Sequence, residues 1–243
     1  MRRRDDKLGS VGAVHAPSRR IRERVSRAGR FDAVVFDNDG LLLDTEESWT
    51  RAERALFERR GREFTPDHKR ELLGSSPRAA AAILEVMLDE PGRGATLIAE
   101  LGILVLNEMG RYAAPRPGAL ALIARLQDAA VPMGLASNAP RFLVDCALSS
   151  AKIPRETFAS ILSADAVTNP KPAPEIYLAV CAALGTEPAR TLVLEDSPTG
   201  IAAGVAAGCY TIAVPSLDGV DLSQASLVVD SLAAPAITQA LGL

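Results

Sequence analysis

The chain has 243 residues, of which 48% are apolar and 23% charged, and its formal net charge at pH 7 is −3. This balance is ordinary for a globular protein with a sizeable core, and it excludes the fibrous and largely disordered classes. No apolar run approaches the ~18 residues of a membrane-spanning helix, so we expect no membrane partner. The only histidines are His15 and His68, which excludes a histidine-rich metal site and disfavours catalysis by a Ser–His pair.

The three cysteines, Cys146, Cys181 and Cys209, lie far apart in apolar, alanine-rich surroundings. They form no C-x-x-C pair and lack the spacing of a metal site, so we expect small buried thiols. A sparse, odd number of cysteines is typical of a reducing compartment. We therefore expect a cytoplasmic protein.

The first thirty residues differ in composition from the rest of the chain. They carry ten basic and three acidic side chains, a net charge of +7, whereas the remainder carries −10. Such a basic block is typical of a disordered tail; an arm for nucleic acid or a membrane surface is the alternative. It lacks the apolar region of a secretory signal. We predict a disordered extension over residues 1–30 and no nucleic-acid partner.

Strand-like segments and helical patterns alternate along most of the chain after residue 30. Strands are expected at 32–36, 132–136, 158–163, 190–195, 210–214 and 226–229, and helices at about 118–130, 140–151, 173–184, 198–208 and 231–241. Such alternation indicates right-handed βαβ units and a parallel sheet. The predicted fold class is α/β, a Rossmann-like parallel sheet core with helices on both faces, built from residues 31–46 and 115–243.

Residues 47–114 show no strand pattern and interrupt this alternation. They contain helix-favouring stretches at 48–60, 66–73, 77–88 and 95–112. Thr65 followed by Pro66 is a typical helix start, because proline is well tolerated in the first turn. We predict an inserted all-α domain over 47–114, with linkers at 45–47 and 115–118.

The segment that follows the first strand carries two carboxylates. Asp37 and Asp39 come after the apolar run 33–36, where a buried parallel strand ends and open α/β sheets bind ligands. Gly40 permits a turn, because glycine accepts a positive φ, so both carboxylates can face one small pocket. A nucleophile or metal ligand at Asp37 and an acid/base at Asp39 fit this arrangement. The alternative is a solvated acidic turn.

Three later segments supply groups that complement these carboxylates. Each follows an apolar run or precedes a helical pattern, and their polar residues are Ser137, Asn138, Lys171, Glu195 and Asp196. Taken singly, each has a structural explanation as an ordinary turn, a surface lysine or a helix N-cap. Together they supply the carboxylates, the hydroxyl and the cation that magnesium-assisted phosphoryl transfer requires.

In this order and spacing, the four segments resemble the four motifs of the haloacid dehalogenase-like (HAD) phosphatase superfamily. The resemblance runs from about residue 31 to the C-terminus. It implies a nucleophile at Asp37 and a general acid/base at Asp39. It further implies phosphate binding by Ser137, Asn138 and Lys171, and a Mg²⁺ site formed by Asp37, the carbonyl of Asp39, Asp196 and Glu195, the last directly or through water.

The helical insert resembles the cap that many HAD phosphatases place between their first two motifs, where substrate choice would reside. Candidate substrate contacts are Glu46, Trp49, Arg51, Ser75, Ser76 and Arg78. Core packing is the alternative for Trp49. For Ser76, the alternative is a plain N-cap ahead of Pro77.

Within the superfamily, the chain looks most like the branch of β-phosphoglucomutase and 2-deoxyglucose-6-phosphatase-like sugar-phosphate phosphatases. Trp49 replaces a histidine of the mutase, and Leu73 replaces a basic residue before its cap-loop glycine. We therefore expect a monomeric, Mg²⁺-dependent phosphatase that hydrolyses a small, sugar phosphate-like metabolite through an aspartyl-phosphate. The alternatives are a β-phosphoglucomutase-like phosphotransferase and a non-catalytic module that binds phospholigands.

Overall fold

The computed structural model describes residues 31–243, so the extension expected over residues 1–30 lies outside the described residues. At its centre is a six-stranded sheet in which every pairing is parallel, with strand order β5-β4-β1-β6-β7-β8. The strands are β1 (Ala33–Phe36), β4 (Met133–Ala136), β5 (Ser160–Leu162), β6 (Thr191–Glu195), β7 (Tyr210–Ala213) and β8 (Leu227–Val228). This confirms the predicted α/β class.

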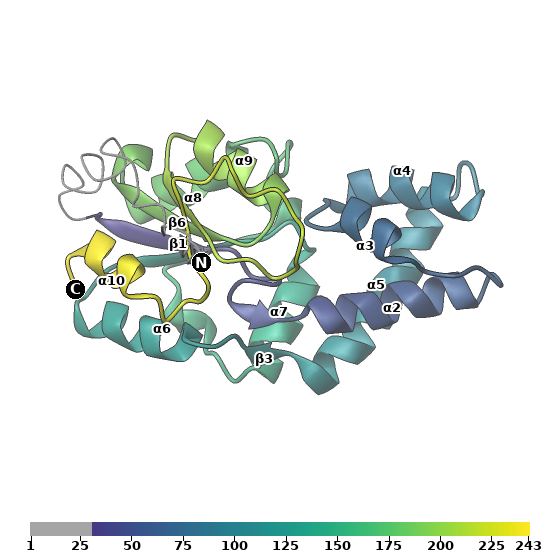
Figure 1. Cartoon of the computed structure of the whole chain (residues 1–243), viewed down its shortest axis with the longest axis horizontal. Helices are drawn as coiled ribbons and strands as arrows, with labels where there is room; N and C mark the ends of the chain where they lie inside the picture. Colours follow the sequence, from purple (N-terminus) through teal and green to yellow (C-terminus); the bar gives the residue numbers. More distant parts are fainter. Residues whose placement is uncertain (1–30) are drawn as a thin grey trace, which may run out of the picture.

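Helices cover both faces of the sheet, as Figure 1 shows. Side chains alternate along a strand, so Val35 and Val193 pack with α8 and α9, whereas Val34 and Phe36 belong to the cluster that contains α6, α7 and α10. The central strands β1 and β6 are buried throughout, which explains their continuous apolar sequences. These helices are α6 (Ala119–Asp128), α7 (Arg141–Ser150), α8 (Glu175–Leu184), α9 (Pro198–Ala206) and α10 (Pro235–Leu241).

Between β1 and β4 the chain forms four helices, which we call the helical insert: α2 (Glu46–Glu58), α3 (Pro66–Leu72), α4 (Pro77–Leu88) and α5 (Gly94–Tyr112). They lie together at one end of the molecule, beside the sheet (Figure 1). Their contacts are made by buried apolar side chains such as Leu56, Leu84 and Leu97. No helix within residues 31–243 has the length and apolar character needed to cross a bilayer.

A two-stranded antiparallel ribbon joins the two chain crossings between the sheet and the helical insert. It pairs β2 (Leu43–Asp44) with β3 (Ala114–Pro115). This ribbon was not predicted, because two-residue strands are too short to leave an alternating pattern in the sequence. The ribbon ties the start and the end of the insert to each other, directly beside the segment that carries Asp37 and Asp39.

Candidate active site

The polar residues of the four sequence motifs meet at one edge of the sheet. Strands β4, β1 and β6 are neighbours, and in parallel strands the carboxyl ends lie at the same edge. The residues that follow them therefore lie close together: Asp37 after β1, Ser137 and Asn138 after β4, and Asp196 after β6. Lys171 joins them from the loop before α8.

The turn after β1 depends on Gly40. Its φ is +80°, and a Cβ built there would lie 2.2 Å from Oδ2 of Asp196, so both the backbone conformation and the close approach require glycine. Arg116, which follows β3, donates hydrogen bonds to the carbonyls of Gly40 (2.7 Å) and Pro215 (3.0 Å). Arg116 was not predicted as a site residue, because no local sequence pattern indicates which distant carbonyls an arginine will reach.

A buried ammonium group neutralises the first carboxylate. Nζ of Lys171 lies 2.6 Å from Oδ1 of Asp37, 2.6 Å from Oε1 of Glu195 and 2.9 Å from the carbonyl of Ala136. Burial alone would lower the pKa of Lys171, but Asp37 and Glu195 outweigh it and raise that pKa. Lys171 therefore keeps its positive charge beside Asp37.

Asn138 fixes the loop that carries this lysine. Its Oδ1 accepts a hydrogen bond from the backbone N–H of Lys171 (3.0 Å), and its Nδ2 donates to the carbonyls of Lys171 (3.0 Å) and Gly74 (2.8 Å). Both amide hydrogens are thus occupied, and the side chain links the Lys171 loop to the end of α3. The contact of Asn138 with phosphate stays a prediction.

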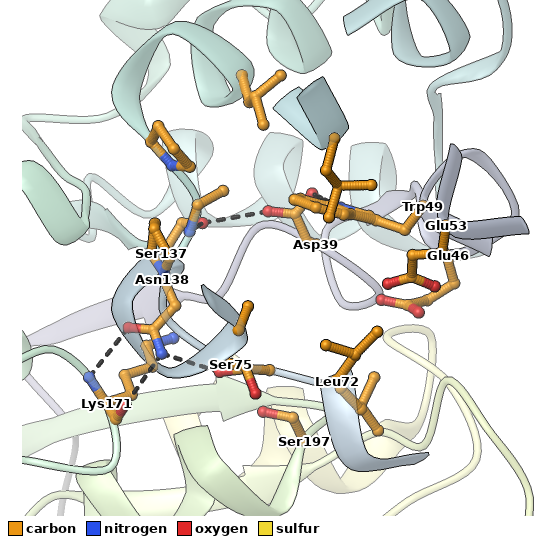
Figure 2. Close-up of a pocket in the computed structure, with 18 of the residues that line it drawn as sticks. Asp39, Glu46, Trp49, Glu53, Leu72, Ser75, Ser137, Asn138, Lys171 and Ser197 are labelled. Carbon is orange, nitrogen blue, oxygen red and sulfur yellow. Dashed lines mark hydrogen bonds between the residues drawn. The ribbon is translucent and has the colours of Figure 1, made fainter. Parts of the chain in front are cut away.

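Four donors orient the carboxylate of Asp39. Its Oδ1 accepts hydrogen bonds from Thr45 Oγ1 (2.9 Å) and Trp49 Nε1 (3.2 Å), and its Oδ2 accepts from Ser137 Oγ (3.1 Å) and Asn38 Nδ2 (3.1 Å). Figure 2 shows Trp49 and Ser137 on either side of it. Trp49 also packs against the apolar core. Its ring therefore contributes to packing, while its N–H contacts Asp39. Thr45 was not predicted as a site residue.

Three carboxylates, Asp37, Glu195 and Asp196, lie within reach of one cation, with one ligand oxygen of each within 4.8 Å of the others. Glu195 is heavily engaged: besides Lys171, it accepts hydrogen bonds from the hydroxyl of Tyr177 (2.6 Å) and from three donors at Asp196 and Ser197. Tyr177 was not predicted as a site residue.

Asp196 offers the oxygen that best suits a metal ion. It is 1% exposed, and its Oδ2 is buried without a hydrogen-bond partner among the described residues. Burial raises the pKa of Asp196 well above its usual range, and the charges of Asp37 and Glu195 add to this. Because a cation would relieve both effects, the residues fit a divalent metal ion bound by oxygen ligands.

A cavity of about 100 Å³ opens from these groups toward the helical insert. Its core side contains Asp37, Asp39, Ser137, Asn138, Lys171 and Asp196, and its insert side contains Glu46, Trp49, Glu53, Lys69, Leu72 and Ser75. One water molecule needs roughly 10–15 Å³ of such space. The cavity therefore has room for a phosphoryl group and part of an attached organic group.

The candidate substrate contacts divide into two groups. Glu46, Trp49 and Ser75 line the cavity. Three others lie outside its lining: Ser76 caps α4 by accepting a hydrogen bond from the N–H of Ala79 (3.3 Å), Arg51 pairs with Glu47 (2.9 Å), and Arg78 is exposed. Their part in substrate choice stays a prediction.

Two buried charged residues of the insert, Lys69 and Glu53, were not predicted as site residues. Nζ of Lys69, on α3, lies 2.9 Å from Glu46 and 3.1 Å from Glu53, both on α2. In the sequence they read as ordinary charged positions of amphipathic helices. Only the packing of α3 against α2 reveals that they are buried and line the cavity.

Comparison with known proteins agrees with this geometry. A family model described as haloacid dehalogenase-like hydrolase matches residues 34–214. The phosphorylated carbohydrates phosphatase of Thermotoga maritima is 31% identical over 203 residues, which cover 81% of this chain and 92% of that protein. CbbY from Rhodobacter sphaeroides, solved with phosphate and, as a variant, with xylulose-(1,5)bisphosphate, superimposes with a TM-score of 0.74 at 27% identity over 84% of this chain and 95% of its own.

Other relatives are much longer than this chain. The bifunctional riboflavin kinase/FMN phosphatase of Arabidopsis thaliana is 33% identical over 184 residues, which are 76% of this chain but 48% of that protein. A further Arabidopsis protein, SUPPRESSOR OF QUENCHING 1, chloroplastic, is 33% identical over 195 residues, which are 76% of this chain but 18% of that protein. The chain thus spans less than half the length of either plant relative.

Proposed function

Because the chain belongs to the haloacid dehalogenase-like hydrolase family, we propose that it is a phosphatase for a small phosphorylated sugar or related metabolite. The observation that carries the proposal is the set of contacts around Asp37. A buried lysine lies 2.6 Å from its carboxylate, and a second, hydrogen-bonded carboxylate follows two residues later at Asp39. The phosphatases among the relatives support the substrate class, and the helical insert would act as the cap that closes over it.

In the proposed mechanism, a carboxylate oxygen of Asp37 attacks phosphorus while the bond from phosphorus to the ester oxygen breaks. Asp39, protonated at that moment, gives its proton to the departing alcohol oxygen. Asp39 then takes a proton from a water molecule that attacks the phosphorus of the aspartyl-phosphate. This step releases inorganic phosphate and restores Asp37.

Lys171 and Ser137 hold the phosphoryl oxygens in this proposal. A phosphate monoester dianion is repelled by an approaching carboxylate, so positive charge must be present before the attack. A divalent cation, for which we propose Mg²⁺, supplies part of that charge when bound by Asp37, Asp196 and the carbonyl of Asp39. Glu195, which accepts a hydrogen bond from Lys171, would hold that lysine in place and would contact the cation directly or through water.

The proposal is tested by hydrolysis of p-nitrophenyl phosphate in the presence of Mg²⁺. We expect turnover by the wild type and a loss of at least ~10³-fold in Asp37→Asn, because this change removes the nucleophile and keeps the side-chain shape. Asp44→Asn, at an exposed aspartate of β2, is the matched control and should keep its activity. Full activity in a folded Asp37→Asn variant would overturn the assignment.

A further inference from the structure

We propose that Glu46, Glu53 and Lys69, here called the insert triad, form a subsite for a neutral, polyhydroxylated leaving group. The subsite would select monophosphates of sugars or polyols over the corresponding bisphosphates. This inference rests on the proposed phosphatase function, since it concerns the group that departs from phosphorus.

The insert triad lies opposite the phosphoryl-binding end of the cavity. Figure 2 shows the carboxylates of Glu46 and Glu53 side by side. Asp39 and Trp49 lie between this pair and Ser137. All three triad residues line the same cavity as Asp37. A phosphate ester with its phosphorus at Asp37 would therefore direct its organic group past Asp39 and toward the triad.

The charges in the cavity disfavour a second phosphate group. Among the residues that line it, all within the described part of the chain, the cations are Lys69 and Lys171. Each already lies within 3.1 Å of two carboxylates. A second phosphate would find no uncompensated cation at the insert end, and the carboxylates there would repel it.

The insert triad sets two carboxylates against one ammonium group. Burial acts to lower the pKa of Lys69, but Glu53 and Glu46 outweigh it and raise that pKa, so the ammonium keeps its proton. Burial also raises the pKa of Glu53. Protonation of Glu53 removes one negative charge and leaves the ammonium of Lys69 paired with Glu46. In neither state does it offer an anion site.

The hydrogen-bonding groups of the triad suit hydroxyls instead. An ammonium has three N–H donors, and Lys69 donates one of them to Glu53 (3.1 Å). Its contact with Oε2 of Glu46 (2.9 Å) is an ion pair, and that buried oxygen has no hydrogen-bond partner among the described residues. The remaining donors therefore stand beside a carboxylate oxygen that can accept a hydrogen bond. A hydroxyl both donates and accepts hydrogen bonds, so adjacent hydroxyls of a sugar or polyol match this pattern. A phosphate dianion can only accept hydrogen bonds, and it would compete with the two carboxylates for the N–H donors of Lys69. Leu72 and Trp49 offer apolar surface for the carbon skeleton.

A purely structural ion cluster that joins α3 to α2 is the competing explanation. Removal of such a cluster would lower stability and slow every substrate alike. Removal of a leaving-group subsite would instead slow substrates in proportion to the hydroxyl contacts they lose. The ratio of kcat/KM between two substrates therefore separates the two explanations.

The test compares kcat/KM for p-nitrophenyl phosphate, a panel of hexose, pentose and hexitol monophosphates, and the bisphosphate of each sugar. We expect the best monophosphate to exceed p-nitrophenyl phosphate, and its bisphosphate to be turned over at least about tenfold less efficiently. In Glu53→Gln, kcat/KM for that monophosphate should fall about tenfold more than for p-nitrophenyl phosphate, because a buried hydrogen bond to a hydroxyl is lost. Glu46→Gln, at a less buried position, should shift the ratio in the same direction if Glu53→Gln fails to fold.

Glu47→Gln is the matched control, because Glu47 lies on the same helix with a 62% exposed side chain. It should leave the ratio unchanged. Equal turnover of monophosphate and bisphosphate, or parallel losses for all substrates in both test variants, would overturn the leaving-group subsite while leaving the phosphatase proposal intact. No turnover of any phosphate ester with Mg²⁺ present would instead contradict the phosphatase proposal itself.

Discussion

Replacement of Lys171 by methionine should destabilise the protein as well as inactivate it. The lysine is 3% exposed, and its ammonium group contacts Asp37 and Glu195 at 2.6 Å each. Methionine fills a similar volume but leaves both carboxylates without their cation. Removal of one partner from a buried ion pair typically costs about 3–5 kcal/mol, so we expect the free energy of unfolding to fall by about that amount.

Urea denaturation at pH 7 in EDTA measures this loss. Lys152→Met, the same substitution at an exposed lysine, is the matched control and should change stability little. Two further results follow from the same reasoning. Added Mg²⁺ should reduce the penalty, because a bound cation compensates Asp37, and Lys171→Met combined with Glu195→Gln should recover part of it. A loss no larger than that of the control would refute the argument.

Three other changes test separate parts of the site. Asp39→Asn should reduce kcat/KM more for alkyl phosphates than for p-nitrophenyl phosphate, whose leaving group needs little protonation. Equal losses of kcat/KM for the two substrates would show that Asp39 has a structural role and is not the proton donor. Asp196→Ala should weaken the apparent affinity for Mg²⁺ on the order of tenfold or more, and in the wild type EDTA should abolish activity and Ca²⁺ should inhibit it. An unchanged Mg²⁺ requirement in Asp196→Ala would show that Asp196 does not hold the metal ion. Glu175 accepts hydrogen bonds from the N–H groups of Thr168 and Asn169, both 2.8 Å, which lower its pKa below 4.5. The unfolded chain therefore binds more protons there, so this stabilisation is present above pH 4.5 and is lost as the pH falls through the native pKa. In Glu175→Gln the free energy of unfolding should fall less steeply as the pH is lowered. The same pH dependence in the variant and the wild type would show that the hydrogen bonds to Glu175 do not stabilise the fold.

The helices were predicted well where a local signal marks their start. Thr65, Ser76 and Ser197 each precede a proline in the first helical turn, and each side chain accepts a hydrogen bond from the N–H three residues later. Capping of this kind is encoded within four residues, so it can be read from sequence alone. The start of α10 at Pro235, later than the expected residue 231, was missed because a run of small residues precedes it without a cap.

The motif residues of the candidate site were predicted from sequence, whereas the contacts between segments far apart in the chain were not. Asp37, Ser137 and Asp196 could be placed together because each follows a strand, and parallel strands bring their carboxyl ends to one edge. The contact between Arg116 and Gly40 and the burial of Lys69 were not predictable in the same way. They depend on how segments far apart in the sequence pack, and no periodicity or spacing specifies which charged side chain will face which partner.

Direct detection of the phosphorylated residue tests the central claim most closely. The protein, or its Asp39→Asn variant in which hydrolysis of the intermediate should be slow, is mixed with a turned-over phosphate ester and Mg²⁺ and quenched with borohydride, which reduces an acyl phosphate to an alcohol. Peptide mass spectrometry should then find homoserine in place of aspartate at position 37, and none in a sample without substrate. Homoserine at a different aspartate, or none anywhere during rapid turnover, would contradict Asp37 as the nucleophile.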